Sequence, residues 1–169
     1  MNILVGNLIS LVGSAFLCAS CVAKTKRRVV ILQLCQCAVL AVAQLVFGKG
    51  AGAVSMSMAG VRNLIIASGH YNFVVMLVIF ALTLGLGLHF NTAGLLGLIP
   101  VAVGLMYTVA LYFSHSIKAL KIWLSVLLFG WIIYSAMIFD LFGTISNTAA
   151  EVLNLVTLAK ISKANQAES

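Results

Sequence analysis

The chain has 169 residues, of which 63% are hydrophobic and 8% are charged, and its ten Lys and Arg stand against three Asp and Glu. Soluble domains carry about 25% charged residues, so this composition excludes an ordinary water-soluble fold. A nucleic-acid-binding domain is excluded as well, because the net charge of +7 would then need a hydrated basic face over a core. The composition indicates a multi-span membrane protein, and the lipid bilayer is its expected partner.

Apolar runs between charged or turn-forming residues predict the elements of the chain. At roughly 20 residues per spanning helix, there is room for about seven or eight spans and for no soluble domain. The runs are continuous and do not alternate, and backbone groups in lipid must bond internally, so helices are expected. We predict an all-α membrane bundle with spans at 3–23, 29–48, 52–69, 72–90, 94–114, 118–139 and 141–160 and a polar cytoplasmic tail at 162–169.

The distribution of Lys and Arg predicts the orientation in the membrane. No basic residue precedes the first run and four follow it, which favours a retained helix over a cleaved signal peptide. With the N-terminus outside and the C-terminus in the cytoplasm, only Lys49 falls outside. Eight basic residues fall on the cytoplasmic side, namely Lys24, Lys26, Arg27, Arg28, Lys118, Lys121, Lys160 and Lys163.

An internal repeat organises the single domain at 1–161. Shifting the sequence by 91 positions superimposes similar residues, among them Gly6 on Gly97, Gly13 on Gly104, Gly52 on Gly143, Ser55 on Ser146 and Asn63 on Asn154. Two three-span repeats, at 3–69 and 94–160, then run parallel because the span at 72–90 is a linker helix. This plan resembles that of the SWEET sugar facilitators, which implies a pore and a binding site between the halves.

Polar side chains inside spans usually face a bundle interior or a water-filled cavity. The predicted solute-binding residues are Asn63, Asn154, Gln44, Ser135 and Trp131. Asn63 and Asn154 are repeat partners whose amides can hold a polar solute from both sides. Gln44 continues a stripe with Gln33 and Gln36 on one helix face. The alternative is that the amides only join neighbouring helices and that Trp131 is a packing residue.

Arg62 lies inside the third span, where an unpaired charge costs at least about 3 kcal/mol. Glu151 in the seventh span has a similar depth, which predicts a buried ion pair between the two. Alternatively, Arg62 reaches the cytoplasmic edge and Glu151 is protonated or bonded to a backbone carbonyl. Pro100, the single proline, interrupts helical hydrogen bonding in the fifth span and is a candidate hinge.

No segment predicts an enzyme, a cofactor or a metal site. The chain has no phosphate-binding loop, no zinc-protease motif and no serine–histidine pair at a recognisable spacing. Its four cysteines, Cys18, Cys21, Cys35 and Cys37, lie in apolar sequence without a histidine nearby and are expected to be packing residues.

Short segments in a matching order resemble the YgjV-type family of bacterial inner-membrane proteins. They are Leu32-Gln33-Leu34 after the basic loop, Gly50 to Ala53 leading to Arg62 and Leu64-Ile65, then Trp131, Gly143-Thr144 and Asn154. The chain departs from that pattern at Ser135, where the family can have an amide, and at Glu151, which has no counterpart. The resemblance implies an inner-membrane location and carries no activity. The helix plan is also similar to that of the PnuC vitamin transporters.

These features predict a small polar solute transporter or facilitator with a central site between the repeats. Uniport is favoured over proton coupling because one deep carboxylate is available. The alternative is a membrane scaffold or regulatory subunit that transports nothing, and a close-packed centre would favour it. The sequence leaves the solute and the formation of a homo-oligomer open.

Overall fold

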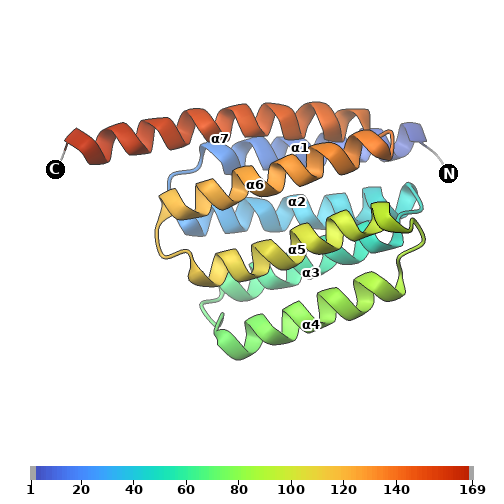
Figure 1. The fold of residues 1–169 in the computed structure, drawn as a ribbon. Coiled ribbons are helices and arrows are strands. Elements are labelled where there is room, and N and C mark those ends of the chain that lie inside the picture. Colours follow the sequence, from blue (N-terminus) through green and yellow to red (C-terminus); the bar gives the residue numbers. More distant parts are fainter. Residues whose placement is uncertain (1–2, 168–169) are drawn as a thin grey trace.

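The computed structural model describes residues 3–167, and side chains as far as residue 163. These residues form seven helices and no strand: α1 (Ile3–Val22), α2 (Lys26–Val46), α3 (Gly50–Ala67), α4 (Phe73–His89), α5 (Leu95–Phe113), α6 (Ile117–Met137) and α7 (Leu141–Ala167). The helices lie side by side and reverse direction at each connection (Figure 1). The predicted all-α class is confirmed.

The outer surface of the bundle is apolar. Among the described residues, α1, α2, α5 and α6 are long and apolar enough to cross a membrane, and α4 is an apolar helix of 17 residues. Large apolar side chains are exposed on the outward faces, with Leu95 at 85% and Leu4 at 69%. Such a surface is expected where lipid tails are the solvent.

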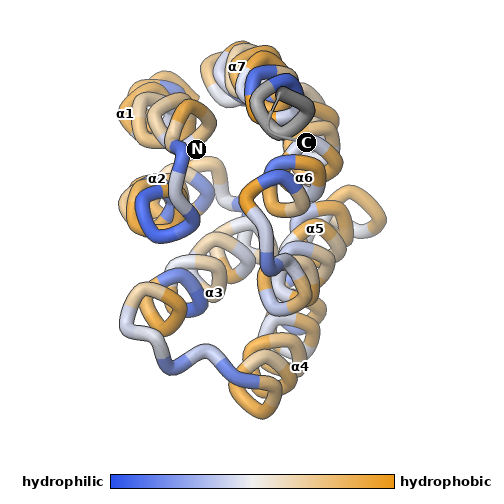
Figure 2. Tube along the Cα trace, turned by 90° about the vertical axis from the view of Figure 1, so that its left-hand side faces the viewer, coloured by the Kyte–Doolittle hydropathy of each residue, from blue (hydrophilic) through white to orange (hydrophobic). Residues whose placement is uncertain are grey.

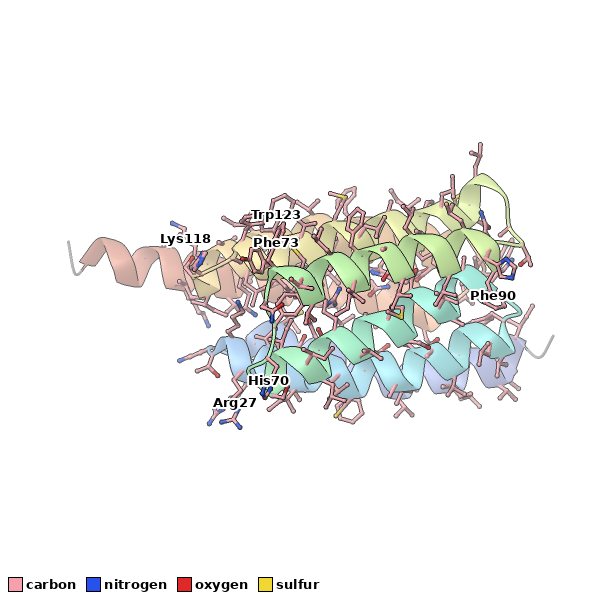
Figure 3. The ribbon with its side chains drawn as sticks, turned by 90° about the horizontal axis from the view of Figure 1, so that it is seen from below. Arg27, His70, Phe73, Phe90, Lys118 and Trp123 are labelled. Carbon is pink, nitrogen blue, oxygen red and sulfur yellow. The ribbon has the colours of Figure 1, made fainter. Side chains whose placement is uncertain are left out.

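Basic residues gather at one end of the bundle. Figure 3 places Arg27 and Lys118 at the end that also holds His70, whereas Phe90 lies at the opposite end. The connections α1–α2 and α5–α6 and the end of α7 all lie at the Arg27 end, as Figure 1 shows. We call this the basic end and the opposite one the outer end.

The spacing of 91 residues recurs in the backbone. Helix α2 begins at Lys26 and α6 at Ile117, and both have 21 residues. Each is preceded by a hydroxyl cap: Thr25 Oγ1 accepts a hydrogen bond from Arg28 N, and Ser116 Oγ accepts one from Ala119 N. These caps satisfy amide groups that the first helical turn leaves free. They fix the start of the second helix of each half in the same way.

The turn that ends each of these helices is also the same in the two halves. Gly48 has a φ of 67° and Phe139, 91 residues later, has a φ of 61°. The next amide bonds back to the equivalent carbonyl, from Lys49 to Gln44 at 2.9 Å and from Asp140 to Ser135 at 3.0 Å. Glycine adopts this left-handed backbone freely, whereas a bulky residue such as Phe139 is strained there.

The last helix is longer than the sequence analysis predicts. The seventh span was expected to end at 160 and to be followed by a tail at 162–169, but α7 continues to Ala167. No glycine or proline follows Lys160, and lysine, alanine and glutamine favour the helix, so nothing local stops it. Residues 168–169 lie outside the described part of the chain.

Six of the helices form a closed ring. Helices α1, α2 and α3 contact one another in chain order, as do α5, α6 and α7, and the halves meet where α1 packs on α7 and α3 packs on α5. Figure 2, which looks down the bundle from one end, shows one row of α1, α2 and α3 and a second row of α7, α6 and α5. Helix α4 lies outside the ring against α3 and α5. Helices α2 and α6 therefore face each other across the centre.

Apolar clusters close this centre at both ends. The cluster at the basic end includes Val29 and Val30 of α2, Leu111 of α5 and Leu120 of α6, all at most 1% exposed. The cluster at the outer end consists of Ala43, Phe47, Tyr134 and Ile138. Burial of these side chains holds the two halves together toward the ends.

Candidate functional site

A cavity of about 80 Å³, measured as the space open to the centres of water molecules, lies between α2 and α6. A water takes about 30 Å³ in the liquid, so the cavity has room for about three waters or a very small solute. All six ring helices line it and α4 does not. The polar lining residues are Ser14, Gln33, Gln36, Gln44, Ser55, Arg62, Asn63, Tyr107, Ser135, Asp140, Ser146 and Asn147.

The predicted glutamine stripe of α2 faces the cavity. Gln33, Gln36 and Gln44 all line it and are at most 8% exposed. The hydroxyl of Tyr107 donates to Gln33 Oε1 at 3.0 Å, and that of Tyr134 donates to Gln44 Oε1 at 3.1 Å. Gln36 has no hydrogen bond within the described chain. The two tyrosines occupy amide oxygens, so the amide N–H groups are left to donate into the cavity.

Arg62 is the buried cation of the site, 2% exposed. Its Nη1 donates to Thr108 Oγ1 at 3.1 Å and to Gly104 O at 3.5 Å, and its Nε and Nη2 reach Asn63 Oδ1 at 3.4 and 3.3 Å. The guanidinium carbon also lies 4.9 Å from the centre of the Tyr107 ring. Only the bond to Thr108 lies within the usual 2.7–3.2 Å range. All the groups that contact the guanidinium are therefore neutral, and most of these contacts are longer than a usual hydrogen bond.

The structure does not bring Arg62 and Glu151 together. No described carboxylate lies within ion-pair distance of Arg62, and its partners come from α3 and α5. Glu151 is half-buried on α7, does not line the cavity, and its Oε2 has no hydrogen-bond partner in the described part of the chain. Similar depth along two helices did not imply contact, because α3 packs on α5 in the ring and α7 packs on α1.

The two repeat-related asparagines have different surroundings. Asn63 lines the cavity, where Arg62 occupies its oxygen. Asn154 does not line it: its Nδ2 donates to Lys121 O at 2.8 Å and Ser125 Oγ at 2.9 Å, and its Oδ1 has no partner among residues 3–167. Asn154 therefore joins α7 to α6, and the expected pair of asparagines across one cavity is not formed.

The remaining predicted residues are placed as follows. Ser135 and Trp131 line the cavity, and Ser135 Oγ accepts a hydrogen bond from Asn147 at 3.3 Å. The Trp131 ring packs edge-on against Tyr134, with 5.6 Å between centres. Pro100 is buried within α5, which continues through it, and it does not line the cavity.

Ser55 and Asp140 are among the cavity residues that the sequence did not predict. Ser55 is 2% exposed and its hydroxyl has no partner among the described residues, although helical serines commonly bond to their own backbone. Asp140 lies in the connection between α6 and α7, where it accepts hydrogen bonds from Gly143 N at 2.8 Å and Ser10 Oγ at 3.0 Å. Burial raises the pKa of this carboxyl, and the two hydrogen bonds oppose the shift. The sequence signal for Asp140 was its position directly before α7, since carboxylates commonly cap the first turn of a helix.

Two lysines join the halves at the basic end. Lys26 of α2 donates to the carbonyls of Leu111 and Ser114 at the end of α5, at 3.1 and 3.0 Å. Lys121 of α6 donates to the carbonyls of Ser20 and Cys21 at the end of α1. We call these contacts the lysine latches. In each half the second helix thus supplies a cation to the negative end of the first helix of the other half.

Comparison with known families identifies the chain. Residues 4–165 match the family Imp-YgjV, described as bacterial inner membrane protein. The chain belongs to this family. Membership confirms the resemblance found in the sequence and places this YgjV-type protein in the bacterial inner membrane as a multi-pass protein. No curated protein and no solved structure matches the chain.

Proposed function

We propose that this YgjV-type protein is a transporter or facilitator of a small polar solute, with the central cavity as its binding site. The supporting observation is the lining of that cavity, to which both halves contribute polar side chains and in which Ser55 of the first half has a free hydroxyl. Polar groups at this depth are costly and tend to be retained for function. A scaffold that only binds a partner through its surface needs no such interior.

The arrangement of the ring supports alternating access between the two halves. Apolar clusters occur toward both ends of the ring, and the halves meet along α1–α7 and α3–α5. Rocking of one half against the other around a fixed central site would open the ends in turn. Pro100 within α5 is the proposed hinge. We infer uniport, without enzymatic activity or a cofactor.

We further propose that the basic end faces the cytoplasm and the N-terminus faces outside. The eight Lys and Arg at this end, against Lys49 at the outer end, follow the positive-inside rule. A fluorescent protein fused to the C-terminus is expected to mature and fluoresce in cells, and an export-dependent alkaline phosphatase fused there is expected to be inactive. The reverse pair of results would overturn the orientation.

A cavity-filling variant tests the proposed transport function. Ala59 lines the cavity, so Ala59→Leu is expected to fill part of it with apolar atoms. Ala81→Leu makes the same change on the exposed face of α4 and is the matched control. The purified proteins are screened by thermal shift against sugars, nucleosides, vitamins, amino acids and organic acids. Solutes that bind are then followed into proteoliposomes.

A solute at 100 times its Kd stabilises the folded state by about 2.7 kcal/mol. It is expected to shift the parent and Ala81→Leu proteins, to shift Ala59→Leu little, and to enter vesicles only with the first two. Equal binding and flux by Ala59→Leu would show that the solute path lies elsewhere. If no solute in the screen binds or crosses, the scaffold function is favoured.

A further inference from the structure

We propose that the central cavity binds a small organic monoanion, a carboxylate of about one to three carbons, with Arg62 as its counter-charge and Gln33 and Gln36 of α2 as additional donors. This inference rests on the proposed transport function and names the substrate class of that site. It depends on which hydrogen-bonding groups of the cavity are already used and which are free.

The charge balance of the cavity lining is the first argument. Its charged residues are Arg62 and Asp140, and the carboxylate of Asp140 already accepts two hydrogen bonds at the outer end. Arg62 lies about 18 Å along the helix axis from that end, at 1.5 Å per residue of α3. A buried guanidinium normally has a carboxylate or phosphate partner, and here its partners are neutral. A bound anion would supply the missing charge.

The free hydrogen-bonding groups are mainly donors. Tyr107 occupies the amide oxygen of Gln33, which leaves the amide N–H groups of Gln33 without partners among the described residues. Gln44 lies eight residues, or about 12 Å, from Gln36 along α2 and is too far away to share a small ligand with Arg62. The Gln36 amide makes no hydrogen bond at all within the described chain, and the buried hydroxyl of Ser55 has no partner. A ligand that accepts several hydrogen bonds suits this set, and carboxylate oxygens are strong acceptors.

The size and the apolar part of the lining limit the ligand. Since a cavity of about 150 Å³ holds a benzene molecule, the cavity of about 80 Å³ corresponds to roughly three to five non-hydrogen atoms. The apolar lining comes chiefly from α6 and α3, with Leu124, Leu127, Leu128, Trp131 and Met56. A short carbon chain with one carboxylate fits both the volume and this mixed lining.

A depression at the basic end has the positive charge that would attract an anion toward the cavity. An open depression there is lined by Lys26, Arg27 and His115 together with Tyr71, whose hydroxyl donates to Thr108 O at 2.8 Å. Thr108 is also the nearest hydrogen-bond partner of Arg62. A cleft lined by one sign of charge concentrates ions of the opposite sign. The depression would therefore collect anions next to the cavity.

The test compares acids with their neutral amides. In the Trp123→Phe protein, Trp131 in the cavity wall is the single tryptophan and reports binding by its fluorescence. The probes are formate, acetate and propionate, each against its own amide, which has nearly the same shape and no charge. At least one acid is expected to bind at least about tenfold more tightly than its amide, as for a hydrogen bond to a charged group.

Two variants on this background assign the binding. Arg62→Gln is expected to weaken acid binding about 10- to 100-fold and to abolish the preference over the amide. Gln36→Leu removes a donor that has no partner in the fold, so it is expected to weaken acid binding by a smaller factor without unfolding the protein. Cys35→Ala on the exposed face of α2 is the control and is expected to bind as the parent does.

The outcomes separate this inference from the function on which it rests. Equal binding of acid and amide, or full acid affinity in a folded Arg62→Gln protein, would overturn the anion site. If Arg62→Gln does not fold, unchanged acid binding by Gln36→Leu overturns it. Neutral solutes that bind while all three acids fail would refute the monoanion and leave transport intact. Failure of every solute would remove both.

Discussion

Arg62→Met is expected to abolish anion binding while leaving the protein at least as stable as the parent. Removing the buried charge relieves at least about 3 kcal/mol of unfavourable burial in the membrane. The variant loses the hydrogen bonds to Thr108, Gly104 and Asn63, of which Asn63 Oδ1 is left without this partner, and an orphaned buried acceptor costs about 1–3 kcal/mol. Thr108 keeps its own bond to Gly104 O at 2.8 Å. The balance therefore favours the variant or is near zero.

This result is measured as the midpoint of thermal unfolding in detergent, together with acid binding reported by Trp131 fluorescence. Val61→Met changes the neighbouring residue, which is 47% exposed, and is expected to keep both properties. A charged group that can be removed without loss of stability is retained for its function. If Arg62→Met unfolds well below the parent, Arg62 is instead a structural residue of the α3–α5 contact.

Loss of both lysine latches is expected to destabilise the protein and open its basic end. In Lys26→Met, Lys121→Met, the C-terminal carbonyls of α5 and α1 lose their cationic donors. A hydrogen bond to a charged group contributes about 1.5–3 kcal/mol, so the pair is expected to lose about 3 kcal/mol or more. At about 2–4 °C per kcal/mol, the unfolding midpoint should fall by roughly 6–12 °C.

Opening is measured on Cys37, which is 6% exposed and lines the cavity. With Cys18, Cys21 and Cys35 replaced by alanine, a water-soluble maleimide is expected to label Cys37 faster in the latch variant. The control is Lys24→Met, Lys118→Met, which removes the same charge from exposed positions at the same end and should change neither rate nor midpoint. Equal effects of the two double variants would show that net charge matters and the latches do not.

Periodic and compositional signals predicted the bundle well. The seven helices follow the seven apolar runs, and the glutamines of α2 face the centre as their common helix face implied. Both results depend on local sequence, because hydrophobic length and a 100° rotation per residue determine them. The end of α7 was missed since helix propensity, unlike hydropathy, continues past Lys160.

Pairings between distant helices were beyond the sequence. The Arg62–Glu151 pair was expected from equal depth, but depth does not say which helices are neighbours in a ring. The repeat likewise paired Asn63 with Asn154, although only Asn63 lines the cavity. The latches were hidden because Lys26 and Lys121 are not repeat partners, so their similar roles leave no signal at the spacing of 91 residues.

The positive charge of Arg62, which has no carboxylate partner among the described residues, also affects the permeability of the membrane to cations. An inner membrane stores energy as a proton gradient, and a wet cavity between two closable ends is a potential leak for protons and sodium. A fixed positive charge 4 Å from such an ion disfavours it by about 4 kcal/mol at an effective dielectric constant of about 20. This lowers the occupancy of the cavity by cations nearly a thousandfold. Arg62, which is proposed to attract the substrate, would therefore also reduce the leakage of protons and sodium through the empty site.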